Sequence, residues 1–426
     1  MSAASNTRLP LIEDLEGYLG GLRGRKLLVR VDFNSPINPQ TGEIIDYSRI
    51  EAHIPTLREL LERGAALVLM SHQGKPGSSD FVTLEQHAEI LSKLLGQDVS
   101  FIDDVIGPAA RRAIKGLEPG SILLLDNTRL LSEEVMEAPP EKHARTIFVK
   151  RLSPLFDGYV NDAFAAIHRS QPSIVGFPLV LPSAAGRLVQ REMDALGKIF
   201  NPSVTPKVFV LGGGKVVDSV KIVEALLERH VADYILTGGL LATLLLHVRG
   251  VEIGAANLDV LRSAGVDELV EKRAARLIEE HGDTLVTPID FVVEKSDGSI
   301  EVVEVGGEIR GYIRDIGPKT VALYKEKMKD AKLIVMRGPM GVMEDERFRK
   351  GTEELVEYAL HCGAYVIFGG GHLASVARRV IREEGIPQTR YHISSGGGAL
   401  LLYLTGKPLP GIEALKLSAA KFYGWR

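Results

Sequence analysis

A chain of 426 residues with a formal net charge of −4 and one cysteine is long enough for two domains, and its slightly acidic balance excludes a general nucleic-acid-binding protein. The single thiol, Cys362, cannot form an intrachain disulfide, which fits a reducing cytosol. The N-terminus lacks a signal-peptide pattern and no apolar run is long enough to span a bilayer, so we expect a cytoplasmic protein without membrane attachment.

The first half of the chain alternates short apolar runs with helical patterns, as expected for a parallel α/β sheet. Strands are predicted at residues 26–33, 65–70, 121–126 and 158–164. Between the first two strands, residues 48–64 keep the apolar spacing of one amphipathic helix. Thr83–Gln86 matches a capping box, which predicts a further helix that runs to about Leu95.

Polar side chains follow these strands. Asp32 and Asn34 end the first strand, where open α/β sheets place ligand groups, although such residues before a proline often only form a turn. Basic residues follow the four strands at Arg49, at His72 and Lys75, at Arg129 and at Arg169. Any one of them could be an ordinary solvated side chain. Several at one sheet edge predict a cradle for a phosphate or carboxylate, because guanidinium groups bind both bidentately.

Prolines interrupt the chain near its middle. Residues 177–183 and 201–206 are proline-bounded breaks, and residues 186–200 between them read as one helix. An edge helix of one domain is the alternative, but we expect a connector with a hinge. The predicted organisation is a first domain at 1–183, a connector at 184–206, a second domain at 207–405, and a C-terminal segment, 406–426, that folds back toward the first domain.

Three glycine triplets mark the second half, at residues 212–214, 369–371 and 396–398, each after an apolar strand. A strand that turns into a helix through glycine leaves backbone N–H groups free at the positive end of the helix dipole, which attracts phosphate. Tight packing between strand and helix is the alternative for a single triplet; three triplets favour phosphate binding. Lys215 follows the first triplet, as a charge-neutralising lysine would. Residues 285–304 predict a small antiparallel excursion.

Common nucleotide motifs are otherwise missing from the sequence. Each Gly-Lys pair lacks the Ser or Thr that follows it in a Walker loop, and there is no Cys/His cluster for zinc. Gly369-x-Gly371-x-x-Ala374 matches a loose dinucleotide fingerprint, but the acidic residue that would hold the ribose is absent, which disfavours a dehydrogenase. The residues alone therefore predict phosphoryl transfer between an anionic substrate and a nucleotide.

Several of these motifs resemble those of phosphoglycerate kinases. In family order, and across almost the whole chain, they are Arg30–Pro36, Ser71–Pro76, Asn161–Phe164 with His168-Arg169, Leu211–Val216, Gly338–Glu344 and Ser394–Ala399. The resemblance is to the archaeal branch. It implies an α/β fold with two doubly wound, Rossmann-like parallel-sheet domains that face a cleft. It also implies reversible transfer of the acyl phosphate of 1,3-bisphosphoglycerate to ADP, in glycolysis and gluconeogenesis. The partners are then the small molecules 3-phosphoglycerate and ATP, with Mg²⁺ bound to the nucleotide, and the enzyme is expected to be a monomer.

The resemblance also implies roles for individual residues. Substrate binding would use Asp32, Phe33, Asn34, Arg49, His72, Gln73, Gly74, Lys75, Arg129 and Arg169. Nucleotide binding would use Gly214, Lys215, Lys221, Gly238, Gly239, Glu344, Gly369, Gly370, Gly371 and His372. Arg49, Lys215, Gly371 and Gly397 would act in the transfer itself, and no metal ligand is assigned.

Four positions differ from the commonest family pattern. Lys75 stands where the family usually has Arg, Ser219 where it has Lys, Arg337 where it has Asn, and His372 where it has Asp. Because of these differences, one alternative to a kinase is a non-enzymatic phosphometabolite sensor that has kept the fold. A kinase for another acid anhydride, such as acetyl or carbamoyl phosphate, is a second alternative, although the many basic residues of the first half favour a substrate with its own phosphate.

Overall fold

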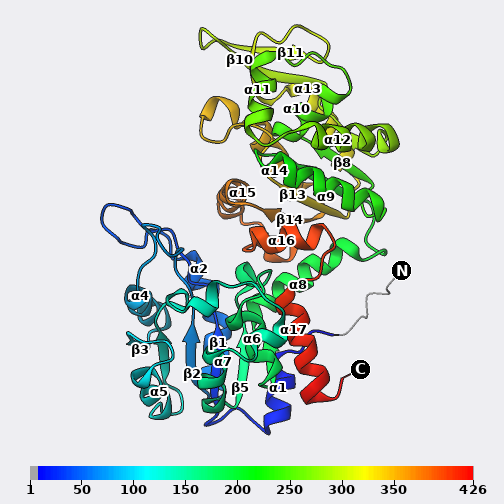
Figure 1. Ribbon diagram of the computed structural model, residues 1–426. Coiled ribbons are helices and arrows are strands. Elements are labelled where there is room, and N and C mark those ends of the chain that lie inside the picture. The colour runs from blue at the N-terminus through cyan, green and yellow to red at the C-terminus, as the bar shows by residue number, and fades with distance from the viewer. Residues whose placement is uncertain (1–7, 426) are drawn as a thin grey trace. The chain divides into compact units, whose positions relative to one another are not determined.

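The computed structural model describes residues 8–425 of the chain (Figure 1). They form two compact units: one runs to Met193 and includes the segment from Pro408 onward, and the other spans Asp194–Lys407. Each unit holds a six-stranded sheet in which every strand pair is parallel. The predicted α/β fold with two doubly wound parallel sheets is confirmed.

The first sheet has the strand order β3-β4-β2-β1-β5-β6. Its strands are β1 (Lys26–Arg30), β2 (Ala66–Met70), β3 (Val99–Ile102), β4 (Ile122–Leu125), β5 (Gly158–Asn161) and β6 (Ser183–Ala185). From β1 the chain builds the sheet outward on one side through β2, and it then returns to the other side at β5. The strand order therefore reverses between β1 and β5, and in open α/β sheets ligands bind at such a switch point.

The second sheet has the order β15-β14-β13-β7-β8-β9. Its strands are β7 (Lys207–Leu211), β8 (Tyr234–Thr237), β9 (Leu285–Val286), β13 (Leu333–Arg337), β14 (Tyr365–Gly369) and β15 (Tyr391–Ser394). Here the order reverses between β7 and β13, which lie side by side. The turns after β7 and β13 are therefore expected to border a ligand site.

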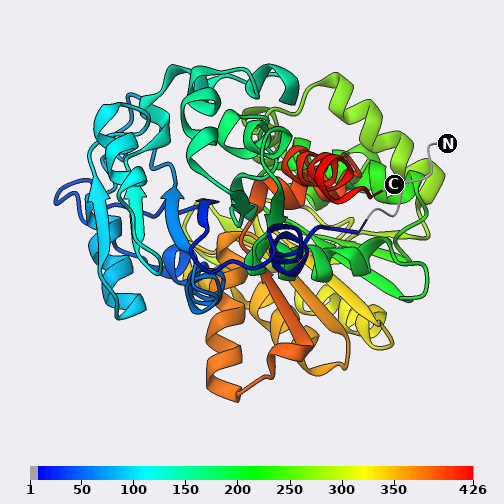
Figure 2. The ribbon, with the colours of Figure 1, turned by 90° about the horizontal axis from the view of Figure 1, so that it is seen from below.

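Helices connect the parallel strands of both sheets (Figures 1 and 2). The first unit contains α1 (Ile12–Leu19), α2 (Ser48–Glu51), α3 (Ile54–Glu62), α4 (Glu85–Leu95), α5 (Pro108–Lys115), α6 (Pro140–His143), α7 (Ile147–Leu152) and α17 (Pro410–Ser418). The second contains α9 (Val216–Glu228), α10 (Gly239–Val248), α11 (Ala255–Ser263), α12 (Glu268–His281), α13 (Pro318–Met328), α14 (Lys350–His361), α15 (Gly371–Glu384) and α16 (Gly397–Leu404). Helix α8 (Arg187–Phe200) carries the chain from the first unit into the second.

A small antiparallel sheet interrupts the second unit. It has the order β11-β10-β12 and consists of β10 (Asp290–Lys295), β11 (Ile300–Glu304) and β12 (Gly311–Ile316). The antiparallel hairpin β10–β11 lies within the predicted excursion at 285–304. Its third strand, β12, lies beyond that range, and residues 285–286 belong to the parallel sheet instead.

Two predicted details of the first unit are wrong. Residues 48–64 form two helices rather than one, because α2 ends at Glu51 and α3 begins at Ile54, with Pro55 near its start. Pro55 has no N–H to give to a continuous helix. The predicted capping box is also wrong: α4 begins at Glu85, its start is not capped by any side chain of the described residues, and the Leu84 amide instead donates to Asp126 Oδ1 at 3.0 Å.

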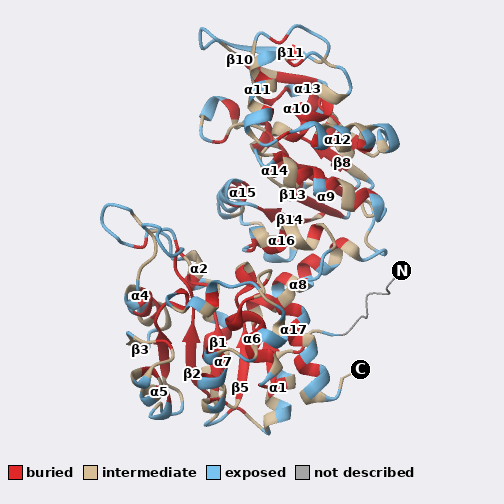
Figure 3. Cartoon of the chain, viewed as in Figure 1, coloured by how far each residue is buried: buried red, intermediate tan, exposed pale blue. Residues whose placement is uncertain are grey.

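The hydrophobic core of each unit is built around its parallel sheet. Figure 3 shows both sets of parallel strands as buried. The β1 core side chains Leu27 and Val29 are fully buried, as are Val208 and Val210 of β7. Such strands, covered on both faces by helices, read as continuous apolar runs. Within residues 8–425, no helix is both long enough and apolar enough to cross a bilayer.

The C-terminal segment packs within the first unit. The Gly411 amide at the start of α17 donates to Ile167 O at 3.0 Å, and Ser418 Oγ at its end donates to Leu181 O at 3.0 Å. Beyond α17, the Tyr423 hydroxyl donates to Ser183 O at 2.9 Å. Figures 1 and 2 both show the red helix α17 against green segments of the first unit.

Candidate functional site

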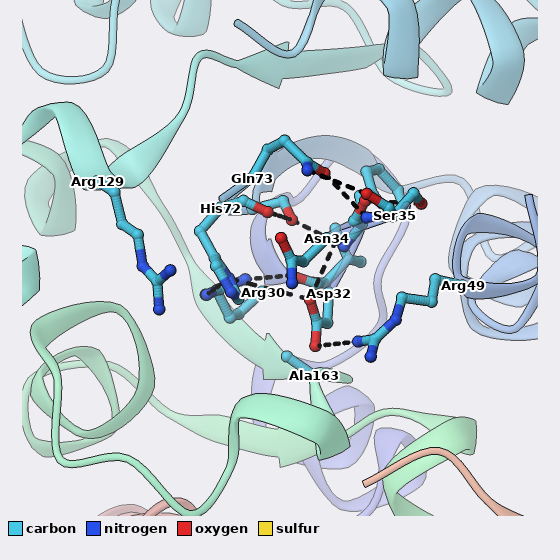
Figure 4. A network of polar contacts seen from close by, with 12 residues as sticks. Arg30, Asp32, Asn34, Ser35, Arg49, His72, Gln73, Arg129 and Ala163 are labelled. Carbon is cyan, nitrogen blue, oxygen red and sulfur yellow. Dashed lines mark hydrogen bonds and ion pairs between the residues drawn. The ribbon is translucent and has the colours of Figure 1, made fainter. Parts of the chain in front are cut away.

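The carboxyl end of β1 carries a buried carboxylate beside several cations (Figure 4). Asp32 is 5% exposed, and Arg49 Nη1 of α2 lies 3.1 Å from its Oδ2. Burial alone would raise the pKa of the Asp32 carboxyl, but His72 first, and then the guanidinium groups of Arg49 and Arg30, hold the pKa below its usual value. Asp32 is therefore ionised at neutral pH and can accept a hydrogen bond from a ligand hydroxyl.

His72 follows β2 and lies on the same edge. Arg30 Nη2 is 3.0 Å from His72 Nδ1, and because a guanidinium group can only donate, Nδ1 is the acceptor. Burial lowers the pKa of His72 to about 3; the nearby Asp32 carboxylate opposes this shift, and the charges of Arg30, Arg129 and Arg169 add to it. The ring is therefore neutral at physiological pH with its proton on Nε2, so His72 presents an N–H donor rather than a charge.

Arg30 also lies at this edge, although it was not among the predicted site residues. It is fully buried in β1, its Nε donates to Ser173 Oγ at 2.8 Å, and Ser173 Oγ donates to the buried Glu134 carboxylate. The Ser173 hydroxyl thus links Arg30 to Glu134; burial raises the pKa of the Glu134 carboxyl, and the Arg30 charge opposes that shift. A lone arginine within the apolar run Leu27–Val31 was the signal, since such a charge is almost never buried without a partner.

Arg129 and Arg169 complete a cluster of positive charge. Burial lowers the pKa of the Arg129 guanidinium, and the nearby charges of Arg169 and Arg30 lower it further. Arg129 Nη1 donates to Gly74 O, and its backbone N–H donates to Asn127 Oδ1 at 3.1 Å. Cations that repel one another in a partly buried place gain most from an anion, so this cluster suits a phosphate.

The remaining substrate candidates mainly hold the loops together. Asn34 Oδ1 accepts the Gly74 amide at 2.8 Å, and the Gln73 side chain pairs with both backbone groups of Ser35 at 2.8 and 3.0 Å. Gln73 is fully buried, and so is Phe33, whose ring packs edge-on against His53. Lys75, by contrast, is exposed in the loop after β2.

The glycines of the second unit fall into two groups. In the first group, the glycine backbone packs directly against the backbone of another turn. The Gly212 amide donates to Arg337 O at 2.9 Å, and the Gly213 amide donates to Pro339 O at 2.7 Å. The Gly239 amide donates to Met340 O at 3.0 Å. Gly238 lies against Met340, and the Gly238 amide donates to Leu211 O at 2.9 Å. These glycines let the turns after β7, β8 and β13 pack closely. Tight packing, the alternative reading of a triplet, applies to Gly212 and Gly213.

The second group is open. A Cβ added to Gly214, Gly370, Gly371 or Gly397 would meet no atom of the described chain within 4 Å. Gly371 and Gly397 are the first residues of α15 and α16, so their amides precede the helical hydrogen-bond ladder. Gly369 is buried against Leu400 beneath them. These open turns, after β7, β14 and β15, therefore leave room for a phosphate beside their backbone amides.

Charged residues flank these turns. Lys215 is the exposed N-cap of α9, and Lys221 is exposed further along that helix. Ser219, where the family usually has a second lysine, is buried, and its hydroxyl donates to Lys215 O at 3.2 Å. At the end of β13, burial lowers the pKa of Arg337 while the Asp218 carboxylate opposes that shift. Arg337 is thus matched by a carboxylate.

Acidic and imidazole side chains are possible ligands of a metal ion within residues 8–425. Among residues 8–425, no three His, Cys, Asp or Glu side chains are grouped to hold a metal ion. Glu344 Oε1 and His372 Nε2 lie 3.5 Å apart, both exposed, and an imidazole is a poor ligand for Mg²⁺.

Comparison with known proteins places this geometry in a family. The sequence profile of the phosphoglycerate kinase family matches residues 17–407, which is nearly the whole chain. The chain belongs to the phosphoglycerate kinase family. It is therefore a kinase, as the glycine turns and the basic cluster predicted.

Relatives support this assignment over their full length. The chain is 49% identical over 410 residues to phosphoglycerate kinase of Saccharolobus solfataricus, covering 96% of this chain and 97% of that protein. It is 49% identical over 415 residues to the Aeropyrum pernix phosphoglycerate kinase, covering 97% of each. Among solved structures, phosphoglycerate kinase from Pyrococcus horikoshii OT3 is similar with a TM-score of 0.86 at 40% identity, covering 97% of this chain and 100% of that chain. The resemblance to archaeal members of the family is confirmed.

Proposed function

We propose that the first unit binds 3-phosphoglycerate at the carboxyl edge of its sheet and the second unit binds the nucleotide at its open glycine turns. The observation that carries this assignment is the cluster of Arg30, His72, Arg129 and Arg169 around one ionised carboxylate, Asp32. A substrate with a phosphate at one end and a hydroxyl and carboxylate at the other matches that arrangement of charge.

Each group of the substrate then has a partner. Arg129 and Arg169 bind the non-transferred phosphate bidentately, with the Nε2–H of His72 and the Lys75 ammonium as further donors. Asp32 accepts a hydrogen bond from the substrate hydroxyl, and the loop that Asn34 and Gly74 form borders the carboxylate end. Gln73 and Phe33 shape these loops from behind.

The reaction needs no protein nucleophile. A β-phosphate oxygen of ADP bonds to the phosphorus of the acyl phosphate as the bond from that phosphorus to the carboxylate oxygen breaks, which leaves 3-phosphoglycerate and ATP. Negative charge on the transferring group is stabilised by Arg49, Lys215 and the amides near Gly371 and Gly397. In the second unit, Glu344 accepts hydrogen bonds from the ribose, the Gly238-Gly239 turn borders the adenine, and Gly214, Gly369, Gly370, Lys221 and His372 lie along the nucleotide.

Mg²⁺ enters as part of the nucleotide substrate and neutralises phosphate charge when bound. The transferred group must pass from one set of residues to the other without meeting water, so we also propose that the connector at 184–206 acts as a hinge and closes the enzyme. Because a single chain supplies both sets of residues, we propose a monomer. We place it in the cytoplasm, where glycolysis proceeds.

Calorimetry with the wild-type enzyme tests the substrate assignment. We expect 3-phosphoglycerate to bind, and glycerate, which lacks the phosphate, to bind at least about 30-fold more weakly. Arg129→Ala and Arg169→Ala should each remove most of that difference, whereas Arg151→Ala, an exposed arginine of α7, should not. Equal affinity for 3-phosphoglycerate and glycerate would contradict the assignment.

A further inference from the structure

A buried histidine joins the substrate edge to the start of α8. His53 lies between α2 and α3 and is 1% exposed. The backbone N–H of Asp32 donates to its Nε2 at 3.0 Å, and its Nδ1 lies 2.7 Å from Asp162 Oδ2. Since Nε2 accepts a hydrogen bond, it carries no proton, and Nδ1–H is the donor to the carboxylate.

Asp162 continues this connection from the end of β5. It is fully buried, and its second oxygen, Oδ1, accepts the amide of Leu188 in the first turn of α8 at 2.9 Å. The carboxylate fits closely there, because a side chain on Gly186 would overlap Asp162. One line of hydrogen bonds thus runs from the Asp32 backbone through His53 and Asp162 to α8.

The segment that carries His53 contacts the same two places on its own. Arg49, four residues before His53, pairs with the Asp32 carboxylate at 3.1 Å. On the other side, Thr56 Oγ1 accepts the Arg187 amide at 2.8 Å, and Glu59 Oε2 accepts Arg187 Nε at 2.6 Å. Residues 49–59 therefore hold Asp32 with one end and the start of α8 with the other.

We propose that His53 is a positioning residue that couples the state of Asp32 to the first turn of α8, the helix that leads the chain into the second unit. This inference rests on the proposed role of Asp32 in binding 3-phosphoglycerate. When the substrate binds Asp32 and Arg49, a shift of the Asp32 backbone moves the imidazole to which it is hydrogen-bonded. The imidazole in turn moves the Asp162 carboxylate. A neutral imidazole suits this role because it donates on one side and accepts on the other within a rigid ring.

Two substitutions separate the two bonds of the imidazole. The amide of His53→Asn lies where Nδ1 lies, so it can still donate to Asp162 but loses the Asp32 amide. The amide oxygen of His53→Gln lies where Nε2 lies, so it can still accept from Asp32 but loses Asp162. His143→Gln is the matched control, because His143 is also buried and its Nε2 is 2.7 Å from the carbonyl oxygen of Ser170.

The readouts are the KM for 3-phosphoglycerate, kcat, and hydrogen exchange of the amides at 186–193 with and without 3-phosphoglycerate, all below the unfolding temperature of each variant. We expect His53→Asn to raise KM about 5- to 10-fold, as loss of one buried hydrogen bond would. We expect His53→Gln to keep KM and to lower kcat by a similar factor. In the wild type and in His143→Gln, 3-phosphoglycerate should slow exchange at 186–193, and in both His53 variants that effect should be lost.

The coupling role would be overturned if both His53 variants kept the wild-type KM, kcat and ligand-dependent exchange. If Tm alone were lowered, His53 would be a merely structural residue. Failure of the wild type itself to bind 3-phosphoglycerate would instead overturn the proposed function on which the coupling rests. The two failures are thus distinguishable in one set of measurements.

Discussion

At the scale of single residues, the site depends on which side chains are charged. Arg30 is linked to Glu134 through the Ser173 hydroxyl, and Asp32 lies within reach of Arg49, whereas Arg129 and Arg169 repel each other. The excess positive charge is therefore concentrated where we place the substrate phosphate. The neutral His72 adds a donor without adding to the repulsion.

Replacing Arg49 by Ala is expected to lower kcat about 100- to 1,000-fold, because one donor to the transferring phosphoryl group is typically worth that much. The side chain is 38% exposed, so Tm should change little. Steady-state assays and thermal unfolding provide the two readouts, with Arg262→Ala, an exposed arginine of α11, as the control. A near-normal kcat would contradict the role of Arg49.

Acidification should destabilise the fold through His72. Its pKa is about 3 when folded and near 6.5 when unfolded, so below pH 6.5 only the unfolded chain takes up the proton. The free energy of unfolding is therefore fully retained above pH 6.5 and falls toward pH 3, by up to ~1.4 kcal/mol per pH unit. Urea unfolding at pH 7, 6 and 5 should show a shallower fall for His72→Asn, which keeps an acceptor for Arg30, than for the exposed-site control His361→Asn.

At the scale of elements, some strand-to-helix turns of the second unit are closely packed and others are open, so substitutions in them should affect stability and catalysis differently. Gly212 lies against Pro339 and Met340, so Gly212→Ala should lower the free energy of unfolding by roughly 1–3 kcal/mol. Gly371 borders open space in the described chain, so Gly371→Ala should leave stability unchanged while a methyl group displaces the phosphate and lowers kcat about 10- to 100-fold. Chemical unfolding and turnover distinguish the two, and wild-type kcat in Gly371→Ala would remove this turn from the phosphate site.

The strands and helices also show which features of the fold could be predicted from the sequence. Apolar runs such as 65–70 and 121–126 predicted the parallel strands, because strands covered on both faces are apolar throughout. The helix predicted at 48–64 failed since periodicity does not detect the break before Pro55. Arg30 was missed because its partners, Ser173 and Glu134, lie more than 100 positions away. Only the folded chain reveals that Gly212 and Gly213 pack while Gly371 stays open.

At the scale of the whole molecule, the proposed role of Mg²⁺ as part of the nucleotide substrate predicts that removing the metal affects turnover and not folding. Because no metal cluster is built by residues 8–425, EDTA should abolish turnover and leave Tm unchanged, and added Mg²⁺ should restore turnover. Differential scanning calorimetry of the apo enzyme with and without EDTA tests the first point. A fall in Tm on chelation would contradict it and would indicate a structural ion.

The hinge proposal predicts a change of size on binding. Small-angle scattering should give a smaller radius of gyration when 3-phosphoglycerate and a non-hydrolysable Mg-nucleotide are bound together than for the free enzyme. Either ligand alone should give a smaller decrease. Identical scattering for the free and doubly liganded enzyme would argue against closure around 184–206.

The most direct test of the proposed kinase activity is a measurement of turnover. The enzyme is given 3-phosphoglycerate, ATP and Mg²⁺, the acyl phosphate is consumed by glyceraldehyde-3-phosphate dehydrogenase, and NADH loss is followed. The account predicts turnover on the order of 10 s⁻¹ or more, and no turnover when acetate or carbamate replaces 3-phosphoglycerate and the corresponding acyl phosphate is assayed. Absent turnover with calorimetric binding of both substrates would contradict it and would leave a sensor that has kept the fold.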